Sequence, residues 1–497
     1  MQFWITIGLI LVLSALGLTY EIAAGRVLAP FFGTSLLTWT TVIAVVLAGF
    51  SLGSALGGLV AERERHVAVA ALRKALIATA VLMALSPTAL GLIYAWGARG
   101  TWGMSLAVIL AFFPASVLVS FPSPFLAKMA VEARPGREGS SLGIVLAAGS
   151  LGAIVGAILA GFVALPLVGS VATFAGCGLA ALLCIPFITG KAPDAGGTGA
   201  RMAGRASHKT IASVAVAAVL IMATMASGAV CRYESGLSCI DVVRQGRVIY
   251  LYADRTLQAA EETTPQDKTP RALVMPYTQW LWSRMDRDLG PAPSVLFIGG
   301  GGYSLPAKLL EARPAARAVA VEIDPLVTEV VRAHLPWAAD TIAQTGGEAG
   351  SDTSGRASDT ARLGIVHADG RVFLNETDRR FDAAVMDAFS SESVPAHLAT
   401  RETYARLAAI VDGPVYVNLI DLPDGRLVRG VHAILRGIYP HVEAVQGPVQ
   451  GAGRTNIVLA ASMTPLAPIG GLPDGYTRVQ VAQGRAFTDD HGWVGHR

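Results

Sequence analysis

Long apolar runs separated by short polar or basic connections make up the first 230 residues of the chain. Each run has about the 20 residues that an α-helix needs to cross the hydrocarbon core of a bilayer. We therefore predict an all-α bundle of seven transmembrane helices within residues 1–230, at 3–19, 37–61, 72–96, 104–126, 142–167, 171–189 and 211–230. The first run has no basic segment before it and no small-residue cleavage site after it, so we interpret it as a helix and not as a signal peptide.

Two of these runs carry small residues at a spacing of four, which allows helix backbones to approach closely inside a bilayer. The second run contains Gly49, Gly53 and Gly57, and the fifth contains Gly152, Gly156 and Ala160. Packing between helices of one chain is the favoured interpretation. The alternative is a seam between the two copies of a homodimer.

Polar residues follow the first apolar run, beginning with Tyr20-Glu21 and continuing to Arg26. A charged residue at the end of an apolar helix can mark a functional polar site. We favour the other interpretation, an interfacial elbow that pairs its own charges. The interiors of the remaining runs contain no series of ionisable residues, so the sequence predicts an anchor or scaffold and gives no sign of a transport path.

After residue 230 the pattern changes to short runs rich in β-branched and aromatic residues. A β-hairpin and linker region is expected at 231–290, with strands at 239–243 and 248–252 around a glycine turn. Short buried strands then alternate with helical segments through 291–497, as in an α/β doubly wound parallel sheet. These strands are predicted at 294–298, 318–321, 365–367, 383–386 and 415–419. Residues 341–361, rich in Gly, Ser, Thr and Asp, are predicted to be a disordered surface insertion.

The composition agrees with a membrane protein that carries a soluble part. Hydrophobic residues make up 53% and charged residues 15% of the chain, whereas a soluble chain carries about 25% charged residues. The formal charge is +7 over residues 1–229 and −4 over the remainder. Neither part has the basic surface of a nucleic-acid-binding protein. None of the four cysteines lies in a CxxC pair, so no structural metal site is predicted.

Basic residues are concentrated in three of the connections between the predicted helices. The connections 63–74, 128–137 and 191–209 hold eleven lysines and arginines, and the other three hold only Arg26 and Arg99. The positive-inside rule places the basic connections in the cytoplasm. Seven helices then put the C-terminal part on the outer side, where Cys231 and Cys239 could form a hairpin disulfide.

Glycines and carboxylates follow the predicted strands of the α/β part. Four glycines, 299–302, follow the first strand, Glu322 ends the second, Asp369 follows the third and Asp387 ends the fourth. Ligands of open α/β sheets bind beyond the carboxyl ends of the strands. The pattern therefore predicts a nucleoside site in which Glu322 accepts the ribose hydroxyls. The alternatives are a tight strand–helix turn for the glycines and a helix N-cap or surface charge for each carboxylate. No GxxxxGK[ST] sequence supports an ATPase.

Residues 232–440 resemble the spermidine synthase family of aminopropyltransferases, which shares the Rossmann-like fold of nucleoside-binding methyltransferases. The motifs are Val-Leu-Phe-Ile-Gly-Gly-Gly at 295–301, Val-Glu-Ile-Asp at 321–324, Ala-Asp-Gly at 368–370, and Phe381-Asp382 before Asp387. The N-terminal part resembles the multi-helix region fused to such domains in bacterial proteins, with Tyr-Glu at 20–21 and Gly-Ser-Ala-Leu-Gly-Gly at 53–58. The resemblance implies a multi-pass protein of the bacterial inner (cell) membrane that contacts the lipid bilayer.

The resemblance also implies roles for individual residues. An S-adenosyl ligand, either S-adenosylmethionine or its decarboxylated form, would be held by residues at several strand ends: Gln258, Gly299, Gly300, Gly301, Glu322, Ala368 and Asp369. Asp387 would be the catalytic base that deprotonates a small-molecule amine acceptor. Tyr277 and Tyr404 would line the acceptor cleft. A ligand made in the cytosol favours a cytoplasmic α/β domain, in conflict with the charge rule, and the side of the membrane is left open.

Three acidic or polar positions of the family are missing from this sequence. Gly302 replaces the acid of the glycine loop, Ser390 replaces the second acid after Asp387, and Thr278-Gln279 follows Tyr277 where the family has His/Gln-Glu. A polyamine carries at least two positive charges, and burying them without partners is costly. A different or smaller acceptor, or intact S-adenosylmethionine as the donor, becomes plausible.

The first interpretation is therefore a membrane-embedded transferase that moves an aminopropyl-type group to an amine. A second keeps the S-adenosyl ligand and changes the reaction to methyl transfer or to intramolecular chemistry of S-adenosylmethionine. A third is a transporter or scaffold whose α/β domain senses a nucleoside or polyamine without turnover.

Overall fold

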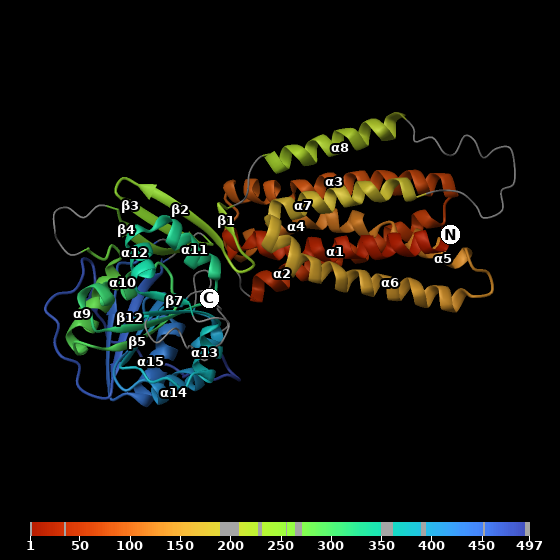
Figure 1. Ribbon diagram of the computed structural model, residues 1–497. Helices are drawn as coiled ribbons and strands as arrows, with labels where there is room; N and C mark the ends of the chain where they lie inside the picture. Colours follow the sequence, from red (N-terminus) through yellow and green to blue (C-terminus); the bar gives the residue numbers. More distant parts are fainter. Residues whose placement is uncertain are drawn as a thin grey trace. The chain divides into compact units, whose positions relative to one another are not determined.

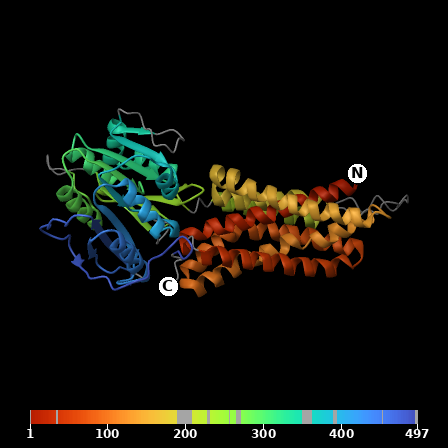
Figure 2. The same ribbon diagram turned by 90° about the horizontal axis from the view of Figure 1, so that it is seen from below.

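The computed structural model describes residues 2–33, 36–188, 208–226, 231–254, 256–263, 271–348, 361–388, 394–450 and 453–492. These residues belong to two units, Met1–Cys239 and Ile240–Arg497. The first unit is helical up to a two-residue strand, β1 (Tyr233–Glu234), and the second is built around β-sheets (Figures 1 and 2).

The apolar runs of the first unit form long helices, as the hydrophobic pattern predicts. They are α1 (Gln2–Phe32), α2 (Leu36–Ala61), α3 (Arg65–Ala95), α4 (Gly100–Ser120), α5 (Ser123–Glu132), α6 (Glu138–Ile158), a π-helical turn (Leu159–Ala164), α7 (Leu165–Cys184), a 3₁₀ turn (Ile185–Phe187) and α8 (His208–Ala226). Within the described residues, five stretches are long and apolar enough to cross a membrane: Phe3–Phe32, Leu36–Ala61, Arg65–Ala95, Gly100–Glu132 and Glu138–Phe187.

The difference between seven predicted spans and five observed stretches has two local causes. The sixth predicted run is joined to the fifth in one apolar stretch, Glu138–Phe187, in which Gly169 forms a kink with φ +77°. The seventh run corresponds to α8, whose apolar part within the described residues is Thr210–Ala226. Residues 227–230 of this run lie outside the described part of the chain.

Helix α1 continues far beyond the run that predicts it, so the expected interfacial elbow after residue 19 is wrong. Tyr20 is fully buried, and its hydroxyl lies 2.7 Å from the hydroxyl of Ser86 in α3. Its ring packs edge-on against Phe112 and Phe174. Because a neighbouring helix supplies a partner for the hydroxyl, the helix can bury this polar group and need not end there.

The two stripes of small residues are contacts between helices of one chain, as the favoured interpretation expected. A Cβ added to Gly53 would lie 2.0 Å from the backbone oxygen of Val117 in α4. A Cβ added to Gly156 would lie 2.2 Å from the backbone oxygen of Ala15 in α1, and the Thr19 hydroxyl donates to the Gly156 carbonyl at 3.0 Å. Only glycine allows these backbones to approach so closely.

Substituting Gly53 by alanine should therefore destabilise the helical unit by about 1–3 kcal/mol, because the added methyl group overpacks the contact with α4. Gly58 lies on the same helix and would have no atom within 4 Å of an added Cβ. Gly58→Ala is thus a matched control, expected to be neutral or to stabilise α2 by up to about 1 kcal/mol. Thermal unfolding of the full chain in detergent measures both, and equal midpoints would contradict the packing described.

Glu234 of β1 packs against the end of the helical unit where α1 ends and α7 begins. Glu234 lies 4.0 Å from the Arg26 guanidinium and accepts hydrogen bonds from the backbone N–H (2.9 Å) and the hydroxyl of Ser170. Cys231 and Cys239 are joined by a disulfide, which confirms the predicted pairing. At the other end of α1, Arg134 of a basic connection stacks on Phe3, 3.6 Å from the ring centroid.

The second unit begins with an antiparallel meander and continues into a nine-stranded sheet. The meander strands are β2 (Cys239–Gln245), β3 (Val248–Ala253) and β4 (Thr256–Glu262). The large sheet has the order β13-β11-β12-β10-β9-β5-β6-β8-β7. Its strands are β5 (Ser294–Ile298), β6 (Arg317–Glu322), β7 (Gly346–Glu348), β8 (Leu363–His367), β9 (Ala383–Met386), β10 (Val415–Asp421), β11 (His441–Gln446), β12 (Thr455–Ser462) and β13 (Thr477–Arg478).

Strands β5 to β10 run parallel and confirm the predicted doubly wound core. One face packs on α13 (Gly370–Glu376), α14 (Arg401–Ile410) and α15 (Arg426–Ile438), around a buried cluster that includes Ile298, Val321 and Met386 (Figure 1). The other face carries α10 (Ser304–Ala312), α11 (Pro325–His334) and α12 (Pro336–Thr345). The parallel strands thus end at one edge, where the predicted ligand site lies.

Two features of the second unit differ from the sequence prediction. Strand β12 runs antiparallel between β10 and β11, so the sheet is mixed at this side. Residues 341–348 form the end of α12 and the edge strand β7, which pairs with β8. The prediction of a disordered insertion is wrong for these residues, and residues 349–360 lie outside the described part of the chain.

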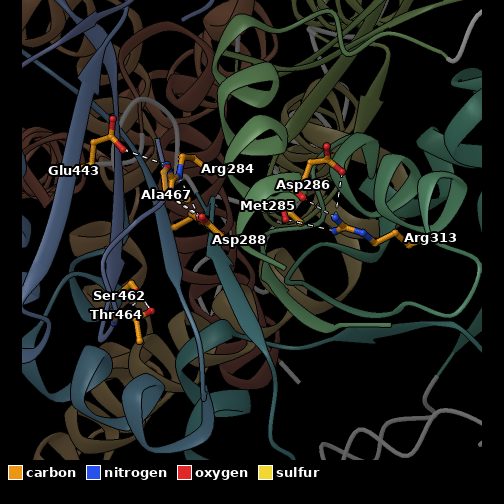
Figure 3. A network of polar contacts seen from close by, with 10 residues as sticks. Arg284, Met285, Asp286, Asp288, Arg313, Glu443, Ser462, Thr464 and Ala467 are labelled. Atoms are coloured by element: carbon orange, nitrogen blue, oxygen red, sulfur yellow. Dashed lines mark hydrogen bonds and ion pairs between the residues drawn. The ribbon is translucent and has the colours of Figure 1, made fainter. Parts of the chain in front are cut away.

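A buried ion pair fixes α9 (Pro276–Asp288) beside the sheet (Figure 3). Arg284 is fully buried and binds Asp288 at 2.7 and 2.8 Å, the Ala467 carbonyl at 2.6 Å and Glu443 of β11 at 3.5 Å. The Tyr416 hydroxyl of β10 also donates to Asp288 at 2.9 Å. These bonds satisfy a charge that would otherwise be costly to bury, and they hold the helix that carries Tyr277.

Candidate functional site

A cleft of about 130 Å³ lies beyond the carboxyl ends of β5 and β9. Strand β4, the start of α9, the glycine loop after β5 and the ends of β9, β10 and β12 all contribute to its walls. The lining residues are Thr256, Leu257, Gln258, Ala259, Met275, Tyr277, Thr278, Phe297, Gly299, Gly300, Gly301, Gly302, Tyr303, Ser304, Leu305, Pro306, Val385, Asp387, Asn418, Ile420, Gln450 and Asn456. The structure therefore brings together Gln258, the glycines, Tyr277 and Asp387, as the sequence predicted.

The glycine loop needs glycine for steric and conformational reasons. Gly299 has φ +102°, and a Cβ there would lie 2.2 Å from the Asp387 backbone oxygen. Gly301 has φ +48°, in the left-handed region that side chains disfavour. The loop thus brings its backbone close to the end of β9, and it presents no side chain at these positions to a ligand in the cleft.

The position at which the family has an acid is closed in this structure. A Cβ added to Gly302 would lie 2.2 Å from the Cβ of Ala259 in β4. The next residue, Tyr303, has φ +56° and is buried, and its hydroxyl lies 2.7 Å from that of Thr328 in α11. The Tyr303 hydroxyl therefore reaches α11, and β4 occupies the space that a side chain at position 302 would need.

Asp387 is held from two sides at the end of β9. The Tyr277 hydroxyl donates to Asp387 Oδ2 at 3.1 Å, and Asn418 Nδ2 donates to Oδ1 at 2.8 Å. Asn456 Nδ2 in turn donates to Asn418 Oδ1 at 3.1 Å. Burial raises the pKa of Asp387 above its ordinary value, although both hydrogen bonds oppose that shift. A carboxylate held in this way can accept a proton from a group in the cleft.

The Glu322 carboxylate accepts hydrogen bonds from the backbone of the glycine loop. Its Oε2 accepts the N–H groups of Gly300 (2.9 Å) and Gly301 (3.1 Å), and its Oε1 accepts the Asp324 N–H (3.0 Å). A carboxylate offers about four acceptor positions, so roughly one stays available for a ribose hydroxyl. Burial raises the pKa of Glu322, and these backbone hydrogen bonds oppose the shift. Glu322 thus shapes the glycine loop, and it is not among the residues that line the cleft.

Asp369 lies at the N-terminus of α13, as the alternative interpretation of a helix N-cap described. Its Oδ1 accepts the N–H groups of Arg371 (2.8 Å) and Val372 (3.2 Å), and its Oδ2 lies 2.9 Å from His397 Nε2. The neighbouring Ala368 donates its N–H to the Glu322 carbonyl at 3.2 Å. Neither Ala368 nor Asp369 lines the cleft. The adenine contact predicted for these two residues would therefore lie outside the cleft.

The two remaining predicted residues occupy different surroundings. Gln258 lies in β4, which is fixed to the rest of the unit because Glu261 accepts the Trp337 and Ala338 N–H groups at 2.6 and 3.2 Å. Tyr404 is 1% exposed and lies in the hydrophobic cluster beneath the sheet, outside the residues that line the cleft. Ser390, where the family has its second acid, lies outside the described residues.

The roles of the two asparagines beside Asp387 were not predicted from the sequence. Asn418 interrupts an apolar strand in Val-Tyr-Val-Asn-Leu-Ile at 415–420, and this polar residue in a buried run was the available signal. Asn456 could not be found in this way, because its place depends on the antiparallel insertion of β12. In the described part of the chain, no group of three or more His, Cys, Asp or Glu residues is arranged to hold a metal ion.

The sheet order and the strand-end cleft together define a doubly wound, Rossmann-like α/β unit. No family model matches the chain. Among curated proteins, a polyamine aminopropyltransferase of Vibrio vulnificus is 28% identical over 152 residues, which are 29% of this chain and 42% of the relative. Polyamine aminopropyltransferase 2 of Streptomyces coelicolor is 29% identical over 164 residues, 32% of this chain and 29% of the relative.

A polyamine aminopropyltransferase of a Ruegeria species is 32% identical over 99 residues, 20% of this chain and 30% of the relative. These matches confirm the resemblance of the chain to the spermidine synthase family, and the chain spans less than half the length of these curated relatives. Among solved structures, a probable spermidine synthase from Corynebacterium glutamicum has a TM-score of 0.41 at 18% identity, covering 51% of this chain and 95% of that one. The spermidine synthase from Thermotoga maritima has a TM-score of 0.34 at 18% identity, covering 47% and 72%.

Proposed function

We propose that the unit Ile240–Arg497 is a transferase that uses an S-adenosyl donor and an amine acceptor, and that the helical unit anchors it in a membrane. The observation that carries the proposal is Asp387, a carboxylate held by Tyr277 and Asn418 in a cleft that the glycine loop also lines. Similarity to polyamine aminopropyltransferases supports the same reaction class.

In the proposed reaction, the acceptor nitrogen attacks a carbon next to the sulfonium sulfur of the donor. The carbon–nitrogen bond forms while the carbon–sulfur bond breaks, and its electron pair stays on sulfur as a neutral thioether leaves. The nitrogen loses a proton to the Asp387 carboxylate. The protein contributes mainly by positioning the two reactants and by accepting this proton.

The residues around the cleft fit the two substrates in different ways. We assign the adenosyl part to Gln258 and the glycine loop, with Glu322 accepting one ribose hydroxyl in addition to its backbone bonds. Asp369 and the backbone of Ala368 are proposed to meet the adenine ring beside the cleft. Tyr277 and Asp387 face the acceptor amine.

The acceptor is expected to carry a single amine rather than several. Asp387 is the one carboxylate among the cleft-lining residues that the structure describes, and the other polar lining groups are neutral amides and hydroxyls. A second ammonium group would be desolvated without a charged partner, which is costly. Wild-type protein with decarboxylated S-adenosylmethionine should therefore use putrescine at least tenfold less efficiently than a monoamine of similar length. An efficient reaction with putrescine would show that another acid completes the cleft.

Product analysis tests the proposed function and separates it from the other reactions. Aminopropyl transfer releases methylthioadenosine, whereas methyl transfer releases S-adenosylhomocysteine. Incubation of the full chain with each donor and a panel of amines, followed by chromatography and mass spectrometry, should yield methylthioadenosine together with an aminopropylated amine. S-adenosylhomocysteine as the only nucleoside product would support a methyltransferase. Tight adenosyl-ligand binding with neither product would support the sensor or scaffold interpretation.

The helical unit is proposed to cross the membrane with its basic connections in the cytoplasm. Arg134 of one basic connection lies at the start of α1, and the disulfide segment lies at its end, against Arg26. The disulfide agrees with an oxidising environment at that end. We expect alkaline phosphatase fused after Arg497 to be active, because the chain after Cys239 then emerges on the outer side. An inactive phosphatase together with a fluorescent cytoplasmic reporter at the same position would reverse this topology.

A further inference from the structure

We propose that Asn418 and Asn456 form a two-amide relay that sets the orientation of the Asp387 carboxylate, and that both are positioning residues of the reaction. The proposal rests on the proposed function, because it assigns a task to residues next to the proposed base. It is carried by hydrogen bonds between side chains of three different strands, two of them neighbours in the antiparallel part of the sheet.

The register of β10 and β12 brings the two asparagines together. Asn418 is paired with Val458, and Asn456 is paired with Ile420. The two asparagines are therefore diagonal neighbours, two positions apart, on the same face of the sheet, where side chains can reach each other. The Asn456 amide nitrogen lies 3.1 Å from Asn418 Oδ1, and the Asn418 amide nitrogen lies 2.8 Å from Asp387 Oδ1.

The direction of the relay follows from the chemistry of the amide group. An asparagine side chain has one accepting oxygen and one donating NH₂ group. Because Asn456 donates to the Asn418 oxygen, the Asn418 NH₂ group must face Asp387. The reverse orientation would bring two oxygens together at Asp387. The accepting carboxylate of Asp387 and the donating amide of Asn456 therefore favour the same orientation of the Asn418 side chain.

The Asp387 carboxylate is oriented by neutral neighbours, namely the amide of Asn418 and the phenol of Tyr277. From α9, Tyr277 donates to the other carboxylate oxygen at 3.1 Å, and the phenol of Tyr476 lies near Tyr277. From β5 and β9, Phe297 and Val385 are apolar lining residues. Because Asn418 donates to one oxygen and Tyr277 to the other, the Asp387 carboxylate is held in one orientation in the cleft.

Asn456→Asp is the decisive variant, because the introduced carboxylate accepts and cannot donate to Asn418 Oδ1. The two carboxylates should then compete for the Asn418 NH₂ group, which weakens its hydrogen bond to Asp387. We expect the acidic limb of the pH profile of kcat/KM to move up by about one pH unit, and kcat at pH 7 to fall about tenfold. Affinity for methylthioadenosine should stay within twofold of wild type. Asn456→Ala, which removes the donor without adding charge, should give a smaller shift in the same direction and serves if Asn456→Asp fails to fold.

Gln450→Glu is the matched control, since it adds a carboxylate to the lining of the same cleft without entering the relay. A shift from Gln450→Glu as large as that from Asn456→Asp would reduce the effect to general electrostatics and overturn the relay. Coincident pH profiles of wild type, Asn456→Asp and Asn456→Ala would also overturn it. If the wild type has no turnover, the proposed function fails. The relay is then tested by ¹³C titration of the Asp387 carboxyl in full chain labelled at aspartate, with the signal assigned by its loss in Asp387→Asn. The titration midpoint of Asp387 must still move in Asn456→Asp for the relay to stand.

Discussion

Asp387→Asn is expected to lower turnover by about two to four orders of magnitude, the usual contribution of a positioned general base. Its affinity for methylthioadenosine should stay within about twofold of wild type, because the proposed adenosyl contacts come from β4, the glycine loop and the ends of β6 and β8. The asparagine keeps the shape of the side chain and loses the capacity to accept the proton. The loss should therefore be in kcat, with little change in ligand binding.

The pH dependence of the wild type should reflect the same group. Only the ionised carboxylate can accept a proton, so activity should fall as the pH drops through the pKa of Asp387. Burial raises that pKa above the ordinary aspartate value, and the loss should begin at a higher pH than it would for an exposed aspartate. In Asp387→Asn, this acidic limb should disappear from the residual rate.

Asp378→Asn provides the control, because Asp378 is exposed in the same unit and should change neither turnover nor the pH profile. Steady-state rates and isothermal calorimetry on the full chain in detergent measure both quantities. Normal turnover of Asp387→Asn would remove the proposed base from the mechanism.

Glu322→Ala is expected to weaken adenosyl-ligand binding by roughly 100-fold or more, since hydrogen bonds to a charged group contribute about 1.5–3 kcal/mol each. The substitution removes a proposed ribose partner and also releases the N–H groups of Gly300 and Gly301, which Glu322 now accepts. A looser glycine loop should also reduce the free energy of unfolding, by about 1–3 kcal/mol.

Calorimetry with methylthioadenosine and thermal unfolding separate these two effects of Glu322→Ala. Glu329→Ala is the matched control, because Glu329 is exposed on the following helix and should leave affinity and stability unchanged. Unchanged affinity in Glu322→Ala would refute the assigned ligand contact, even if stability falls as expected.

Much of the site could be predicted because strand ends are local features. The glycine loop, Glu322 and Asp387 each follow an apolar run directly, and a parallel sheet brings the ends of such runs to one edge. Gln258 and Tyr277 were located by resemblance, and the structure places both in the cleft. Asp369 shows the limit of this reasoning, because the same residue pattern also describes the helix N-cap that it forms.

The features that could not be predicted depend on contacts distant in sequence. Asn456 reaches the site only because β12 inserts antiparallel beside β10. A side chain at position 302 is excluded by Ala259, which belongs to a separate sheet. In the helical unit, α1 continues through Tyr20 because Ser86, from another helix, accommodates its hydroxyl. Apolar periodicity alone contains no information about such partners.

A single-turnover experiment tests the central claim most directly. The full chain, in excess over decarboxylated S-adenosylmethionine labelled in its aminopropyl group, is mixed with a monoamine acceptor and quenched at intervals. The account predicts that donor disappears as methylthioadenosine and the labelled aminopropyl amine appear in equal amounts, in the wild type and not in Asp387→Asn. Quantitative recovery of intact donor from the wild type, with the ligand bound, would contradict a transferase and leave a binding protein.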